Sequence, residues 1–105
     1  MAVQLFQEIY RRTDTWPRPQ AFGLMMDIRR AAMGISTNLS EGQAQPDSPE
    51  FKEFVAMSLE QLGELQGLLA VARQNPLLVA AEIEPLLHQA RELDKKLQEL
   101  GATLA

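Results

Sequence analysis

Five arginines in the first half of the chain have the side-chain chemistry to bind an anion such as a nucleic-acid phosphate. A guanidinium group is planar and permanently charged, and it donates paired hydrogen bonds to phosphate oxygens. Residues 1–45 contain five basic and four acidic side chains, whereas the remaining residues contain five basic and ten acidic side chains. One hypothesis is therefore a nucleic-acid-binding cluster made of Arg11, Arg12, Arg18, Arg29 and Arg30.

The charge of the whole chain and the nearby carboxylates favour a structural role for these arginines. The net charge is −4, whereas nucleic-acid-binding domains usually present a basic surface. If the surrounding segments are helical, Glu8 is one turn away from Arg11 and Arg12, and Asp27 is one turn away from Arg30. Local ion pairs are therefore available to three of the five arginines.

Arg29 and Arg30 are consecutive, so on a helix their side chains point about 100° apart and cannot share one contact surface. One of them could instead donate a charged hydrogen bond to Glu64 of a neighbouring helix. Such a bond would brace two helices, and we expect this kind of structural role for at least one of the two arginines.

The sequence lacks the residue patterns of the common catalytic and metal sites. There is no cysteine, which excludes disulfides, thiolate catalysis and cysteine-ligated zinc. His88 is the only histidine, and no metal-binding histidine pair or nucleophile-elbow motif occurs. We expect a non-enzymatic protein that has no catalytic residue, metal, cofactor or small-molecule substrate.

Apolar residues recur every three or four positions, a spacing that is typical of amphipathic helices. One or two prolines lie between neighbouring segments, and proline ends a helix because it has no N–H to donate. The start of the fourth segment is uncertain around Pro85. The predicted helices span residues 2–15, 20–41, 48–74 and 81–103.

The apolar positions of each predicted helix define the side that should face a core. The first helix has Val3, Phe6, Ile9, Tyr10 and Thr13 on one side. The second has the stripe Phe22, Met25, Ile28, Ala32, Ile35 and Leu39, and the fourth has Leu86, Ala90, Leu93, Leu97, Leu100 and Leu104. Short linkers force neighbouring helices to be antiparallel, so we predict an all-α, up-down-up-down four-helix bundle as a single domain over residues 1–105.

Three glycines within or beside the predicted helices have positional meaning. Gly42 follows Asn38 and Glu41 at the end of the second helix, where we expect it to adopt the left-handed conformation that closes many helices. Gly63 and Gly67 lie four residues apart inside the third helix. Two interpretations remain open for this pair: tolerated small residues, or a surface that lets another helix approach closely.

The stretch from Ile28 to Gly42 resembles the central motif of the four-helix-bundle proteins encoded in 23S rRNA intervening sequences. Those proteins are related to the accessory variability determinant proteins of diversity-generating retroelements. The similarity extends to residues 10–17 and 51–69, although Gly34 and Gln61 stand where serine is usual. The positions that carry the motif are Ile28, Arg29, Arg30, Asn38, Glu41, Gly42 and Glu64.

The resemblance implies a homo-oligomer, specifically a ring-shaped pentamer. It also implies an alternative function, because the retroelement members bind nucleic acid and a reverse transcriptase through basic surfaces. Transferred to this chain, that function would place structured RNA or a DNA–RNA hybrid on the arginine cluster.

No apolar run is long enough to cross a bilayer, and the first twenty residues lack the apolar region of a secretory signal. We therefore expect a cytoplasmic protein without a membrane partner. Since the sequence offers no catalytic group, the leading hypothesis is an oligomeric scaffold or interaction protein, and nucleic-acid binding is the alternative.

Overall fold

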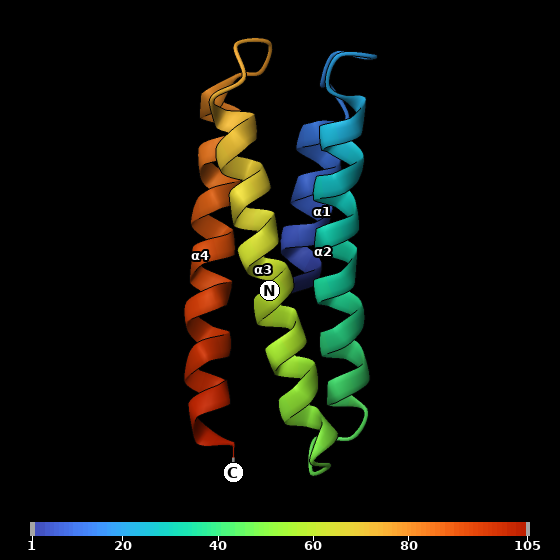
Figure 1. Ribbon diagram of the computed structural model, residues 1–105, viewed down its shortest axis with the longest axis vertical. Helices are drawn as coiled ribbons and strands as arrows, with labels where there is room; N and C mark the ends of the chain where they lie inside the picture. Colours follow the sequence, from blue (N-terminus) through green and yellow to red (C-terminus); the bar gives the residue numbers. More distant parts are fainter. Residues whose placement is uncertain (1, 105) are drawn as a thin grey trace.

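The computed structural model describes residues 2–104, which fold into four antiparallel helices (Figure 1). The helices are α1 (Ala2–Thr13), α2 (Phe22–Gln43), α3 (Glu50–Arg73) and α4 (Ala80–Thr103). Both α1 and α3 contact α2 and α4, so α1 and α3 lie diagonally across the bundle. The predicted all-α, up-down-up-down four-helix bundle is confirmed. Its dimensions are 45 × 19 × 18 Å, which makes it a long and narrow rod.

The core follows most of the stripes that the sequence predicts on α2 and α4. Met25, Ile28, Ala32 and Ile35 of α2 are buried. At the two ends of the α2 stripe the prediction is wrong for Phe22, which is 46% exposed, and Leu39 is only partly buried. The corresponding seam of α4 buries Leu86, Ala90, Leu93 and Leu97, while Leu100 at its end is 37% exposed. These side chains meet in one continuous hydrophobic core, as expected for helices whose apolar positions recur every three or four residues.

The predicted inner side of α1 was partly wrong. Leu5, Ile9 and Thr13 are the buried residues of this helix, whereas Val3 is 57% exposed and Tyr10 is 37% exposed. Leu5, Ile9 and Thr13 follow one another at intervals of four positions, so they form one line that faces the core. Val3 and Tyr10 belong to a second apolar line, and helical spacing alone could not decide which of the two lines faces inwards.

The helix α1 is much shorter than its neighbours. Its 12 residues correspond to about 18 Å, whereas the 22 to 24 residues of the other helices correspond to about 33–36 Å. Figure 1 shows α1 beside only one half of α2. The linker after α1 contributes Trp16 to the core, and the Trp16 backbone N–H donates to the Thr13 carbonyl at 3.1 Å.

Pro85 lies inside α4, which begins at Ala80. Proline has no N–H, so it cannot donate to the carbonyl of Ala81 in the preceding turn. The residue before the helix, Val79, is extended, with φ −91° and ψ 110°. Helix α4 starts five residues, or about 1.4 turns, before its proline.

The described helices contain no segment that is both long enough and apolar enough to cross a membrane.

Gly42 does not close α2 in the way that the sequence suggested. No described residue has a positive φ, and α2 continues through Gly42 to Gln43. A Cβ atom on Gly42 would lie 3.1 Å from Cδ2 of Phe51 and 3.2 Å from Cβ of Phe54. Glycine lets the start of α3 pack directly against the α2 backbone, because a Cβ atom would be a few tenths of an ångström too close to the two phenylalanines.

A second close approach between α2 and α3 pairs Gly34 with Gln61. The end of the Gln61 side chain occupies the space that a Cβ atom on Gly34 would fill. The Oε1 atom of Gln61 is buried there, and no hydrogen-bond donor reaches it among the described residues. The two positions that depart from the family's usual serine are therefore in contact with each other.

These two glycines should respond to alanine with opposite signs. In Gly34→Ala the flexible end of Gln61 can swing out, so we expect a gain of up to about 1 kcal/mol from helix propensity. In Gly42→Ala the crowded atoms include Cβ of Phe54, which cannot rotate away, so overpacking of about 1–3 kcal/mol should outweigh that gain. Urea unfolding at a fixed protein concentration measures both changes. Equal effects of the two substitutions would contradict this account of the α2–α3 contact.

Candidate functional site

Arg29 of α2 binds the C-terminal end of α1. Its Nε donates to Oγ1 of Thr13 at 2.9 Å, and its Nη2 donates to the Tyr10 carbonyl at 3.2 Å. The guanidinium lies over the Tyr10 ring, with Cζ 4.3 Å from the ring centroid, and Nη2 is 3.9 Å from a carboxylate oxygen of Asp14. Only 12% of the Arg29 side chain is exposed, so this cation is committed to contacts within the chain.

These contacts supply hydrogen-bond partners to carbonyls at the end of α1. The last carbonyls of a helix have no partner within it, and they carry the negative end of the helix dipole. Arg29 supplies a cation and a donor to the Tyr10 carbonyl, while the Thr15 hydroxyl donates to the Arg12 carbonyl at 3.3 Å. The Thr13 hydroxyl accepts from Arg29 and donates to the Ile9 carbonyl at 2.7 Å, so it is satisfied although it is buried.

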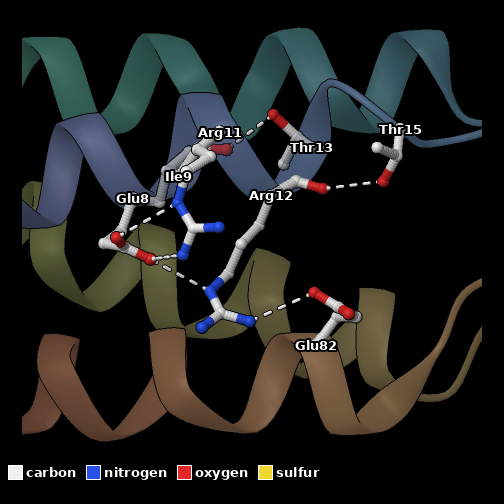
Figure 2. Close-up of polar contacts among 7 residues, drawn as sticks. All are labelled: Glu8, Ile9, Arg11, Arg12, Thr13, Thr15 and Glu82. Carbon is white, nitrogen blue, oxygen red and sulfur yellow. Dashed lines mark hydrogen bonds and ion pairs between the residues drawn. The ribbon is translucent and has the colours of Figure 1, made fainter.

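Arg11 and Arg12 share the carboxylate of Glu8, as Figure 2 shows. Nη2 of Arg11 is 2.7 Å from Glu8 Oε2, and Nε of Arg12 is 3.1 Å from the same oxygen. Nη1 of Arg12 also donates to Glu82 of α4 at 3.1 Å. Arg12 therefore connects α1 to α4, and the two local ion pairs that the sequence predicted are confirmed.

The shared carboxylate has altered acidity. Hydrogen bonds from Arg11 and then from Arg12 lower the pKa of Glu8 below its ordinary value, because both stabilise the charged form. The hydrogen bond between Arg11 and Glu8 also raises the pKa of Arg11. Both effects stabilise the charged pair on the surface of α1.

Arg30 and Arg18 are the least constrained of the five candidate arginines. Arg30 pairs with Asp27 at 3.3 Å, as predicted, but 75% of its side chain is exposed. Arg18 lies in the linker before α2, where its guanidinium is 5.5 Å from the Phe22 ring centroid. Its Nη2 approaches the sulfur of Met25 at 3.7 Å, and no ion pair of the described residues includes Arg18.

The suggested bond from Arg29 or Arg30 to Glu64 does not form. Glu64 is exposed on α3, and none of the ion pairs among residues 2–104 includes it. Arg29 turns towards α1 instead, because the Tyr10 ring and the end of α1 lie on that side of α2. The expected bracing function of one arginine is present, but it joins α1 to α2 rather than α2 to α3.

Asn38 and Glu41 of the motif lie inside α2, since the helix continues past both to Gln43. Glu41 is exposed and Asn38 is half-buried. Ile28, by contrast, is fully buried in the core. The motif residues thus divide into core positions, a helix brace at Arg29 and glycine contacts, rather than converging on one site.

Polar side chains of α3 and α4 surround an open pocket of about 440 Å³, where Asp94 accepts hydrogen bonds from Gln66 and Gln98. Residues 2–104 contain no group of histidines and carboxylates that is placed to hold a metal ion. His88 is exposed on α4. A shallow pocket of about 180 Å³ adjoins the arginines and is lined by Tyr10, Met26, Arg29, Arg30 and Met33. Its walls are mainly apolar, which suits a side chain of another protein better than a phosphate.

The sequence could not have indicated the partners of Arg29 or the contact of Arg12 with Glu82. Thr13 and Tyr10 are 16 and 19 residues from Arg29, and Glu82 is 70 residues from Arg12. Such pairs depend on how whole helices pack, and spacing within one helix carries no information about them.

The fold and the site define a four-helix-bundle protein in which Arg29 of α2 braces α1. The model of the 23S rRNA-intervening sequence protein family matches residues 1–99. The chain therefore belongs to that family. A comparison with curated proteins found no match.

Replacing Arg29 should destabilise the bundle, whereas replacing its neighbour should not. Arg29→Ala removes two hydrogen bonds from a cation and one cation–π contact, which together should cost about 2–3 kcal/mol. Arg30→Ala removes only an exposed ion pair and should cost less than about 0.5 kcal/mol. Chemical unfolding at one protein concentration compares the two variants. Equal losses would contradict the assignment of Arg29 as the brace.

Glu8→Gln should lower stability in a pH-dependent way. The pKa of Glu8 is lower in the folded chain than its ordinary value of 4.5, so its contribution is complete above that pH and is lost as the pH falls through the folded pKa. The melting temperature of the variant should therefore lie below that of the wild type at neutral pH. The difference should shrink as the pH falls below 4.5, and a difference that stays constant down to strongly acidic pH would contradict the prediction.

Proposed function

We propose that this chain is a non-enzymatic, cytoplasmic scaffold protein that assembles into a homo-oligomer, specifically a pentamer. The observation that carries the proposal is the distribution of exposed apolar side chains. Seven large ones lie on α1, α2 and α3, two (Leu77 and Val79) lie in the linker before α4, and Leu100 is the one within the described part of α4. The seven are Val3, Tyr10, Phe22, Met26, Met33, Met57 and Val71. Exposed apolar surface concentrated on part of a small protein favours an interface with another chain.

The engagement of the arginines also supports a scaffold. Arg29 and Arg12 hold α1 against α2 and α4, and Arg11 is paired with the carboxylate of Glu8. These contacts use the cations within the chain itself, which leaves the apolar faces as the larger unexplained surface.

The mass of the purified full-length chain in solution tests this proposal. Sedimentation equilibrium and native mass spectrometry at micromolar concentration should give a mass near five times the 11.7 kDa of one chain. A single species of 11.7 kDa across the concentration range would contradict oligomeric assembly.

Nucleic-acid binding remains a second candidate because two of the arginines are available. Arg30 is largely exposed, and Arg18 has no acidic partner among the described residues. The corresponding ligand would be structured RNA or a DNA–RNA hybrid, with a reverse transcriptase as an accompanying protein partner. In an oligomer, symmetry would bring several copies of these arginines together.

Fluorescence anisotropy with a labelled RNA hairpin and a DNA–RNA hybrid tests this candidate. If it is right, affinity should fall steeply with salt concentration, and Arg18→Ala/Arg30→Ala should weaken binding and reduce the salt dependence. Lys95→Ala/Lys96→Ala on α4 is the control with the same change of charge. No binding at low salt would exclude this candidate and leave the scaffold proposal intact.

A further inference from the structure

Five of the seven exposed apolar side chains of α1, α2 and α3 lie on two surfaces. The first, which we call the α1–α2 face, consists of Tyr10, Met26, Arg30 and Met33 around the shallow pocket described above. Met33 is 50% exposed and Met26 is 39% exposed. The cation of Arg30 stands at the edge of this apolar surface, because most of its side chain is exposed.

The second surface, the α3 face, runs along the exposed side of α3. It consists of Glu53, Met57, Glu60, Glu64 and Val71, which are three, four or seven positions apart and therefore form one line on the helix. Val71 is 61% exposed and Met57 is 40% exposed. Among the described residues, the ion pairs include none of these three glutamates.

The glycines Gly63 and Gly67 flank the α3 face. Both are exposed, and a Cβ atom on either would have no heavy atom within 4 Å. They therefore have no packing function within the described bundle, although each costs about 1 kcal/mol relative to alanine in a helix interior. Their lack of side chains leaves the backbone of α3 open to close approach from outside.

The two faces are complementary in charge. Between Glu53 and Val71 the helix α3 carries three glutamates and no basic residue. The α1–α2 face has Arg30 at its edge. This arginine pairs with Asp27 at 3.3 Å, but 75% of its side chain is still exposed. Each face also supplies exposed methionine, a flexible side chain that fills irregular gaps at interfaces.

We propose that the α1–α2 face of one copy packs against the α3 face of the next copy. Met57 of the next copy would enter the pocket between Tyr10, Met26 and Met33, and Arg30 would face the line of glutamates. This inference rests on the proposed function, since it requires a homo-oligomer, and it adds which surfaces meet.

This contact is heterologous, because two different surfaces of the same chain are used. Within the α1–α2 face, Tyr10 lies on α1, which does not contact α3, whereas Met26, Arg30 and Met33 lie on α2, which packs beside α3. The two faces share no residue, so one copy can engage a different neighbour through each face. A heterologous contact closes into a ring or continues as a filament, whereas a two-fold dimer would pair one face with itself. The geometry thus favours cyclic assembly over a symmetric dimer.

Two charge-reversal variants of the full-length chain test the inference. Arg30→Glu/Met33→Glu blocks the α1–α2 face, and Glu60→Arg/Glu64→Arg blocks the α3 face. Glu92→Arg/Glu99→Arg on the exposed side of α4 is the control, because it makes the same charge change as the second variant outside both faces. Circular dichroism of each variant verifies that it is folded, and sedimentation velocity measures its assembly.

Each face variant alone should weaken self-association at least tenfold, while the control assembles as the wild type does. Mixing the two face variants should produce a one-to-one pair with twice the mass of one chain, because each retains the face that the other lacks. A wild-type chain that is only monomeric overturns the proposed function and this inference together.

An oligomeric wild type whose assembly survives either face variant overturns this inference alone. The same holds if the mixture of the two variants forms no pair, since a heterologous contact requires one. Should either face variant fail to fold, Met57→Glu on the α3 face and Met26→Glu on the α1–α2 face replace it with the same expected outcomes.

Discussion

The contact between Arg29 and the end of α1 is the interaction on which the N-terminal half of the bundle depends. Helix α1 has only 12 residues, and helices of that length are marginal in water without tertiary support. Arg29 supplies that support at the position where the unpaired carbonyls and the helix dipole require a cation. Once α1 is held there, Leu5 and Ile9 cover the core, Arg12 reaches Glu82 of α4, and Tyr10 forms a wall of the α1–α2 face.

The other half of the architecture depends on how closely α2 and α3 approach. Gly42 makes room for Phe51 and Phe54, and Gly34 makes room for the amide of Gln61. These contacts pack two helices of more than 20 residues along the rod, while α1 is held by polar contacts at its end. The stretch from Ile28 to Gly42 contains both Arg29, which binds α1, and Gly42, which makes room for α3. These two residues of α2 therefore position its two neighbouring helices.

Much of the fold could be predicted from the sequence, because helical spacing and proline positions are local properties. The four helices, most of the stripes of α2 and α4, and the ion pairs of Glu8 and Asp27 follow from such rules. The partners of Arg29, the contact of Arg12 with Glu82 and the packing function of Gly42 did not follow. Each depends on the distance between two helices, and that distance is set by side chains far apart in the sequence. For the same reason, the sequence could not show which of the two apolar lines of α1 faces the core.

Family membership and geometry together indicate that the most recognisable residues of this chain maintain its shape. The central claim is that Arg29 holds α1 in place, and amide hydrogen exchange of the wild type and Arg29→Ala tests it most directly. If the claim is right, the amides of α1 should lose protection in the variant while those of α3 keep theirs, since α3 does not contact α1. Unchanged protection of α1, or an equal loss in all four helices, would contradict it.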